Sequence, residues 1–332
     1  MAKQHDEPLV RVGERIGSYE ILEALGTIGI ADRFRVRGSG GDERILGVVG
    51  ARHPGLVTRL RDAHLERLRH PNLVGVIEIL EVGAQPGIVT ERFEGPTLRA
   101  WNEASHRHEV VLAAFRGLVE GVGAAHKAGE VHRDLRPDMV VVEGGGAPVA
   151  RLLDLGVASA MFDLTTGGRS VTTSGTIIGR PHYWAPERAR RPVSADARSD
   201  LFSLGCLLYE LMCGQGPFAG LNLYDCYHAT LEERYVPLDV RCPRAPPAVL
   251  TAVSLLLRAD PERRIQTCAE LLERLDPFTL TGEQPDHAPT PVPAEPAALP
   301  PPSRPTSVLP FLAGGVAIGA ILAGVAWAAF GR

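Results

Sequence analysis

The residues best suited to chemistry lie in one short run, residues 132–139, which reads His-Arg-Asp-Leu-Arg-Pro-Asp-Met. Its first aspartate, Asp134, has an arginine close by on each side, and a further carboxylate follows at Asp154. A carboxylate can accept a proton, or it can bind a hard cation that prefers oxygen ligands.

The run resembles the catalytic loop of protein kinases, whose pattern is His-Arg-Asp-Leu-Lys-Pro-x-Asn. In that family the aspartate accepts the proton of the substrate hydroxyl, and the resemblance implies this role for Asp134. Two positions depart from the pattern: Arg136 stands where the family has lysine, and Met139 stands where it has a magnesium-binding asparagine. The question is therefore whether the chain still transfers phosphate.

Further motifs similar to those of bacterial serine/threonine protein kinases follow in the family's order over about residues 19–275. They resemble the first strand and glycine-rich loop at 19–26, the turn after helix C at 70–74, the hinge at 88–93, the Asp-Phe-Gly motif at 154–156, the Ala-Pro-Glu motif at 185–187 and the helix F motif at 198–205. The resemblance implies an α+β, bilobal fold. A small β-rich N-lobe is expected at about 19–93, and a larger helical C-lobe at about 94–277.

Several of the retained residues have structural roles in that family. The resemblance places His132 and Leu155 in a stack of apolar side chains that links the lobes. It also places Asp200 below the catalytic loop, whose backbone this aspartate holds. Glu187, at the end of the activation segment, is expected to form a buried ion pair with Arg264. A kept scaffold is therefore expected, whatever the state of the nucleotide site.

The loop that would cover the phosphates departs from the family pattern Gly-x-Gly-x-x-Gly. Residues 26–31 keep the first glycine, Gly26, and have Gly29 at an intervening position. Ile28 brings a β-branched side chain where the loop must pass close to a phosphate. Arg33 replaces the valine that packs on the adenine in the family. Taken alone, this loop is no evidence for nucleotide binding, and a plain β-hairpin is the alternative.

The strand lysine that holds the α- and β-phosphates in the family is also missing. Its position falls on Val48, or on Gly47 if the register slips by one residue, and neither residue is a cation. Its glutamate partner in helix C is missing as well. Arg33 or Arg35, on the neighbouring strand, is the candidate for a relocated cation.

The expected magnesium site is weakened in the same way. The thioether of Met139 is a poor ligand for a hard cation that prefers oxygen. Asp154 remains as the candidate metal ligand, but one carboxylate without a second contact would hold magnesium weakly. ATP and Mg²⁺ are therefore the expected cofactors only if nucleotide binding remains, and otherwise none is expected.

The activation segment has lost a family feature too. Its candidate residues are Thr172, Thr173, Thr176 and Arg180. In the family, a Gly-Thr-Pro step supplies a threonine that bonds the catalytic aspartate, and here Arg180 takes the place of that threonine. Arg180 is expected either to pair with Asp134 and block it or to remain solvated.

Composition and charge limit the class of protein. The chain has 332 residues, of which 45% are apolar and 22% charged, enough to bury a large core. A net charge of −4 provides no basic footprint, so no nucleic-acid partner is expected. The five cysteines lie far apart without a Cys-x-x-Cys pair, which indicates idle thiols in a reducing compartment. Residues 1–18 are predicted to be a charged N-terminal tail without a secretory signal.

The C-terminal part is predicted to lie outside the globular domain. Residues 278–307 are rich in proline, which favours an extended, disordered linker. Residues 308–330 carry no charge and, at about 1.5 Å per residue, can cross a hydrocarbon core of about 30 Å as one transmembrane helix. With no export signal, a single-pass membrane protein with a cytoplasmic kinase-like domain is expected. Gly315 and Gly319 begin a stripe of small residues, so a homodimer through this helix is a hypothesis.

The preferred interpretation is a membrane-tethered pseudokinase, a regulatory or scaffold module that engages a cytoplasmic protein partner. The alternative is an atypical but active serine/threonine protein kinase that transfers the γ-phosphate of ATP to a protein substrate. It would use Asp134 as base, Asp154 on magnesium and a displaced arginine in place of the lysine. A third hypothesis is a nucleotide sensor, which binds ATP without transferring it.

Overall fold

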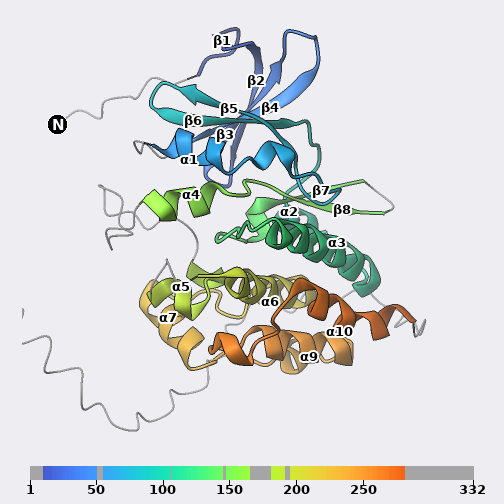
Figure 1. Ribbon diagram of the computed structural model, residues 1–332. Coiled ribbons are helices and arrows are strands. Elements are labelled where there is room, and N and C mark those ends of the chain that lie inside the picture. The colour runs from blue at the N-terminus through green and yellow to red at the C-terminus, as the bar shows by residue number, and fades with distance from the viewer. Residues whose placement is uncertain are drawn as a thin grey trace, which may run out of the picture. The chain divides into compact units, whose positions relative to one another are not determined.

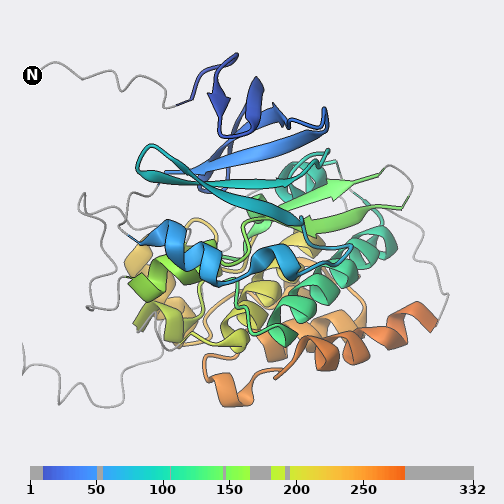
Figure 2. The ribbon, with the colours of Figure 1, turned by 45° about the horizontal axis from the view of Figure 1, so that its top comes forward.

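The structure is a computed structural model of the chain. It describes residues 10–50, 55–104, 106–144, 147–164, 181–190 and 195–280. All of these belong to the first of two compact units, Met1–Leu299. Within this unit a β-rich N-lobe precedes a helical C-lobe (Figure 1), and a second view shows the same division (Figure 2).

Within the described residues, the N-lobe is an antiparallel sheet of six strands in the order β1-β2-β3-β4-β6-β5. The strands are β1 (Arg15–Ile16), β2 (Tyr19–Ile28), β3 (Ala31–Arg37), β4 (Glu43–Val49), β5 (Val76–Val82) and β6 (Gln85–Glu91). The sheet begins at Arg15, inside the stretch predicted to be a tail, because β1 pairs with the start of β2. Gly29 forms part of the turn between β2 and β3, and its φ of +71° is a conformation that favours glycine.

Alternate residues of β4 lie on opposite faces of the sheet, as the period of two in a strand requires. Leu46 and Val48 are buried in the apolar cluster on one face. Ile45 and Val49 are buried in separate clusters on the other face, which the rest of the domain covers. Gly47 lies between them in sequence and therefore shares that inner face.

A short helix, α1 (Leu56–Asp62), and the turn η1 (Leu65–Arg67) follow β4. Leu56 and Leu60 are four residues apart, so they share one face of α1, and both are fully buried. The helix packs against β5 and α4 (Val157–Leu164). No glutamate occurs in α1, so this helix offers no carboxylate of that kind to a cation on the sheet.

The described part of the C-lobe is mainly helical, with one two-stranded sheet of β7 (Val140–Glu143) and β8 (Val149–Leu152). Its remaining elements are α2 (Leu98–Asn102), α3 (His108–Lys127), η2 (Pro137–Met139), η3 (Pro181–Tyr183), α5 (Pro186–Arg190), α6 (Ala197–Cys213), α7 (Leu223–Leu231), α8 (Leu238–Arg241), α9 (Pro247–Leu256), η5 (Pro261–Arg263) and α10 (Cys268–Leu280).

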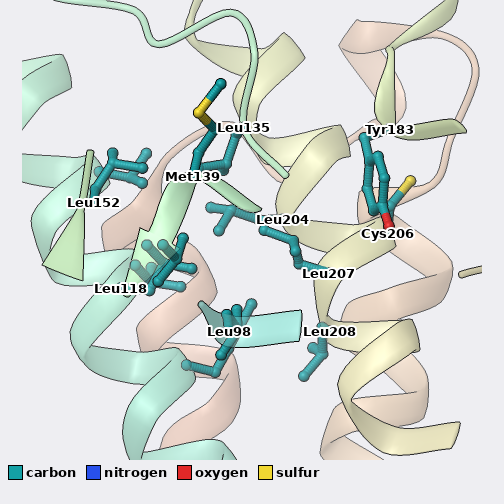
Figure 3. Close-up of a cluster of buried hydrophobic side chains, with 14 of the residues drawn as sticks. Leu98, Leu118, Leu135, Met139, Leu152, Tyr183, Leu204, Cys206, Leu207 and Leu208 are labelled. Carbon is teal, nitrogen blue, oxygen red and sulfur yellow. The ribbon is translucent and has the colours of Figure 1, made fainter. Parts of the chain in front are cut away.

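Helix α6 is the centre of the C-lobe core. Its side chains are buried on nearly every side, which is typical of a helix enclosed by other elements. Figure 3 shows Leu204 and Leu208 of this helix in one cluster with Leu118 of α3 and Leu98 of α2. The helix is therefore a closely packed, rigid support for the elements around it.

The prediction of an α+β, bilobal fold is confirmed for the described residues. The last helix, α10, ends at Leu280 and so extends into the stretch 278–307 that was predicted to be a linker. The rest of that stretch and the predicted transmembrane segment 308–330 lie outside the described residues. In the part of the chain that the structure describes, no helix has the length and apolar content needed to cross a membrane.

Candidate functional site

Helix α6 holds the run of residues 132–139 in place through Asp200. The two carboxylate oxygens of Asp200 accept hydrogen bonds from the backbone N–H groups of His132 and Arg133, each at 2.8 Å. His126 donates to the same carboxylate at 2.9 Å. Burial alone would raise the pKa of Asp200, but the bond and charge of His126 lower it overall. Arg133 is held at a φ of +62°, a strained backbone conformation that these bonds maintain.

His132 connects this loop to the segment that carries Asp154. Its Nε2 donates to the carbonyl oxygen of Leu153 at 2.9 Å, and its Nδ1 accepts from the backbone N–H of Asp134 at 3.2 Å. The ring is 2% exposed, so both bonds are shielded from water. The two segments that carry the candidate carboxylates are therefore fixed relative to each other.

Asp134 lies between two buried arginines. Arg136 Nε donates to one carboxylate oxygen at 3.1 Å, and Arg188 Nη2 lies 3.6 Å from the other. Arg188 also stacks over the ring of Trp184, with its guanidinium carbon 4.3 Å from the ring centroid. Burial lowers the pKa of the Arg188 guanidinium to about 10. The sequence did not identify Arg188, because nothing in its spacing marks an approach to Asp134.

A chain of alternating charges continues from Arg136 toward α6. Arg136 Nη1 donates to Asp138 at 3.0 Å, and Asp138 also accepts from Arg99 Nε at 3.1 Å. Arg99 Nη1 in turn donates to Glu210 at 3.0 Å, and Tyr183 donates to the same carboxylate at 2.6 Å. Burial raises the pKa of Glu210, although Tyr183 and Arg99 oppose that shift. Sequence reasoning missed this network, which ties the loop to Glu210, a second carboxylate of α6.

Met139 keeps the backbone geometry of the loop while supplying no polar ligand. Its N–H donates to the carbonyl oxygen of Arg136 at 2.9 Å, and its own carbonyl oxygen accepts from Leu153 N–H at 2.8 Å. Its side chain is 1% exposed, next to Leu135 in the apolar core (Figure 3). No group of three or more His, Cys, Asp or Glu side chains among the described residues is arranged to hold a metal.

Asp154 pairs with a cation from the N-lobe. Arg33 Nη2 donates to Asp154 Oδ1 at 2.5 Å, and the two side chains are 0% and 3% exposed. Asp154 has a φ of +56°, the second strained position in this site. Its charge is thus neutralised by an arginine that belongs to the chain itself. The carboxylate that sequence marked as the metal ligand is already paired.

The strand pairing places the position of the missing lysine at Gly47, and not at Val48, which was the first register predicted. Arg33 on β3 pairs with Gly47 on β4. Val48 lies on the other face of the sheet, where it is 4% exposed and packs among apolar side chains. Gly47 is therefore the β4 residue that lies against the Arg33 guanidinium. The sequence could not decide between the two, because a shift of one residue exchanges the faces of a strand.

The structure also separates the two arginines proposed as a relocated cation. Arg35 lies two residues beyond Arg33 on the same strand, but its side chain is 35% exposed. It pairs with Glu23 at 2.7 Å and with Glu43 at 3.8 Å, at the rim of the sheet. Of these two arginines, it is Arg33 that reaches Asp154.

The loop between β2 and β3 lies next to Met139 and Asp154. A Cβ atom on Gly29 would lie 2.7 Å from Met139 Sδ and 3.1 Å from Asp154 Oδ2, so a larger residue would have to displace these side chains. Gly26, in contrast, has open space around its Cα and a φ of +87°. Ile28 packs against a buried apolar cluster that comes from both lobes, formed by Ile45, Val74, Phe93, Val141 and Leu153.

The structure contains an ion pair between Glu187 and Arg264. Arg264 donates to both carboxylate oxygens of Glu187, at 2.9 and 3.2 Å, and its side chain has no exposed surface. Leu155 is 8% exposed in the main core cluster, to which Leu65 also belongs. The predicted activation-segment residues lie outside the described residues: Thr172, Thr173, Thr176 and Arg180.

Comparison with known proteins agrees with this geometry. The family model described as protein kinase domain matches residues 62–275, which is more than half of the chain. The serine/threonine-protein kinase PknB of Mycobacterium tuberculosis is 32% identical over 247 residues, covering 72% of this chain and 38% of the relative. A probable serine/threonine-protein kinase of Streptomyces coelicolor is 32% identical over 272 residues, covering 77% of this chain and 39% of the relative.

The chain thus spans under two fifths of the length of these curated relatives. A probable serine/threonine-protein kinase of Corynebacterium efficiens shows the same proportions, with 31% identity over 71% of this chain and 38% of its own. The motifs, the bilobal fold and the family match lead to one conclusion. This chain belongs to the protein kinase family.

Proposed function

We propose that the chain is a pseudokinase, a signalling module that binds a partner protein instead of transferring phosphate. The observation that carries the proposal is the buried ion pair between Arg33 and Asp154. In active kinases this aspartate holds magnesium on the phosphates of ATP. Here its charge is already neutralised by the chain's own side chain, and both partners are shielded from water.

The residues present do not fit magnesium. Magnesium requires close to ideal octahedral coordination by oxygen. The site offers Asp154, which Arg33 engages, and the thioether of Met139 where the family has an amide oxygen. A cation beside Asp154 would also meet the positive guanidinium of Arg33. No step through a metal ion follows from this arrangement.

The residues do not fit the nucleotide either. The β2–β3 turn, which in the family covers the phosphates, here lies directly against Met139 and Asp154 at Gly29. Arg33 begins at the position where the family packs a valine on the adenine, and from there it extends to Asp154. Ile28 lies against the apolar cluster next to Phe93, which belongs to the hinge-like stretch 88–93. The chain's own side chains take the place of a ligand.

ATP is therefore expected to leave the melting temperature of the purified chain unchanged, with or without Mg²⁺. A ligand bound only by the folded state at 100 times its Kd would stabilise by about 2.7 kcal/mol, which is about 5–10 °C for a domain of this size. Differential scanning fluorimetry at rising ATP concentration makes the measurement. A shift that grows with ATP and saturates would contradict the proposal, and a shift without magnesium would favour the nucleotide sensor.

One observation favours the second candidate function, an atypical active serine/threonine kinase. The catalytic loop is intact around Asp134, with Arg136 in contact and Asp200 beneath it. A cation also lies beside Asp154, although it comes from β3. In this alternative Arg33 would release Asp154 and bind phosphate when a nucleotide enters. Phosphotransfer by the wild-type protein, considered in the Discussion, decides between the two.

We further propose that residues 308–330 anchor the protein in a membrane, with the kinase-like domain in the cytoplasm. The support is the uncharged run after the proline-rich stretch 278–307. The 332-residue chain, expressed in a bacterial host, is expected to pellet with membranes and resist carbonate extraction. A chain that ends at Pro277 is expected in the supernatant. Recovery of both chains in the soluble fraction would refute the anchor. A homodimer through Gly315 and Gly319 remains a hypothesis within this proposal.

A further inference from the structure

Arg33 connects the two lobes directly. It lies on β3 in the N-lobe, and Asp154 belongs to the segment after β8 in the C-lobe. The ion pair joins residues 121 positions apart, and neither side chain has appreciable contact with water. Because water screens such a pair very little, removing one partner leaves a buried charge without compensation.

The packing of β4 is matched to this arginine. A Cβ atom on Gly47 would overlap Arg33 Nη1 and lie 3.0 Å from the guanidinium carbon. The guanidinium is therefore seated over Gly47, where any other residue would displace it. Arg33 Nε and Nη1 have no hydrogen-bond partner among the described residues. Asp154 is thus the carboxylate that compensates this buried cation.

Two apolar contacts close the same side of the domain. Met139, from the C-lobe, lies against Gly29 at the turn between β2 and β3. Ile28, one residue earlier, packs against the cluster that combines Ile45 of the N-lobe with Val141 of the C-lobe. A polar contact and two apolar contacts therefore join the lobes where the family would place a nucleotide and its metal.

We propose that Arg33 is a built-in counter-cation that keeps the two lobes closed in the absence of any nucleotide or metal. This inference rests on the proposed function, because a pseudokinase has to maintain its binding shape without ATP. Arg33 supplies the positive charge beside Asp154, and Ile28 fills the apolar cluster. The closed arrangement is thus a permanent property of the fold.

Thermal unfolding and hydrogen exchange of the full chain in mild detergent test this inference. Arg33→Met is expected to lower the melting temperature by about 10 °C, because it leaves Asp154 buried without a counter-charge. It should also raise amide exchange in residues 26–33 and 153–156 together. Arg35→Met, the matched control on the same strand, is expected to change neither, because Arg35 is partly exposed at the rim.

The double variant Arg33→Met, Asp154→Asn keeps the test decisive if the single variant fails to fold. A buried pair replaced on both sides removes the uncompensated charge, so its melting temperature should return to within a few degrees of wild type. A double variant that is no more stable than Arg33→Met, or that fails to fold as well, would overturn the inference. So would Arg33→Met behaving like Arg35→Met.

The failure of this inference can be distinguished from failure of the proposed function. If ATP does not change the melting temperature of wild type and Arg33→Met behaves like the control, then only the proposed role of Arg33 as a counter-cation is refuted. If ATP with Mg²⁺ stabilises wild type, the proposed function fails first. In that event a ligand can separate Arg33 from Asp154, and the proposed role of Arg33 fails as well.

Discussion

The purified chain is expected to transfer no labelled γ-phosphate, either to itself or to generic protein substrates, above the background of the assay. Three features that handle charge in active kinases are altered together. The turn between β2 and β3 lies against Met139, and glycine stands at position 47 in place of the lysine. Arg33 also occupies Asp154. Each such part typically contributes a factor of about 10² or more in rate. Their effects do not simply add, but the joint loss leaves little activity.

The control for this assay is Asp134→Asn. Incorporation by wild type that Asp134→Asn abolishes would establish the active-kinase alternative and end the pseudokinase proposal. If neither protein is active, the substitution should still change stability, because Arg136 and Arg188 would lose the carboxylate that lies between them. A fall in melting temperature without any activity to lose would identify Asp134 as a structural residue.

Arg264→Met is expected to lower the free energy of unfolding by about 3–5 kcal/mol, because it leaves the carboxylate of Glu187 without its buried cation. Arg264 has no exposed side-chain surface and also donates to the carbonyl oxygens of Arg258 and Arg198. Its substitution therefore removes several bonds as well as the charge. Urea unfolding followed by circular dichroism measures the change.

Arg274→Met is the matched control, since Arg274 forms an ion pair with Glu270 at 2.8 Å on an exposed face of α10. Surface pairs at this spacing contribute about 0.3–0.5 kcal/mol, so its effect should be near the error of the measurement. Equal effects of the two substitutions would show that Glu187 and Arg264 are not a buried pair in solution.

The parts of the site that could be predicted are those fixed by backbone motifs. The roles of Asp200, Glu187 and Arg264 follow from residues that the family keeps in order. Each makes hydrogen bonds whose partners are determined by the fold. The catalytic loop belongs to this group too, since His132 and Met139 hold it through backbone atoms. Such contacts survive even where a side chain has been replaced.

The parts that could not be predicted depend on which way a side chain points. Val48 and Gly47 are both uncharged, so no residue type marks the inner face of β4. Only the pairing of β3 with β4 shows that Gly47 lies on that face. Arg33 and Arg35 are the same residue type on the same strand, and they are distinguished by the space over Gly47 and by the glutamates that pair with Arg35. Arg188 approaches Asp134 through tertiary packing that has no local signal.

The fit between Arg33 and Gly47 also restricts how this protein could change over time. A lysine at position 47 would overlap Arg33 Nη1, so the buried guanidinium would have to move to admit it. Losing Arg33 first would leave Asp154 buried and unpaired, at a cost that few proteins of marginal stability tolerate. A lysine at position 47 is therefore expected to arise together with a change at Arg33, quite apart from the replacements at Met139 and in α1. The cation has moved from β4 to β3, and we expect that related chains which keep Arg33 also keep Gly47.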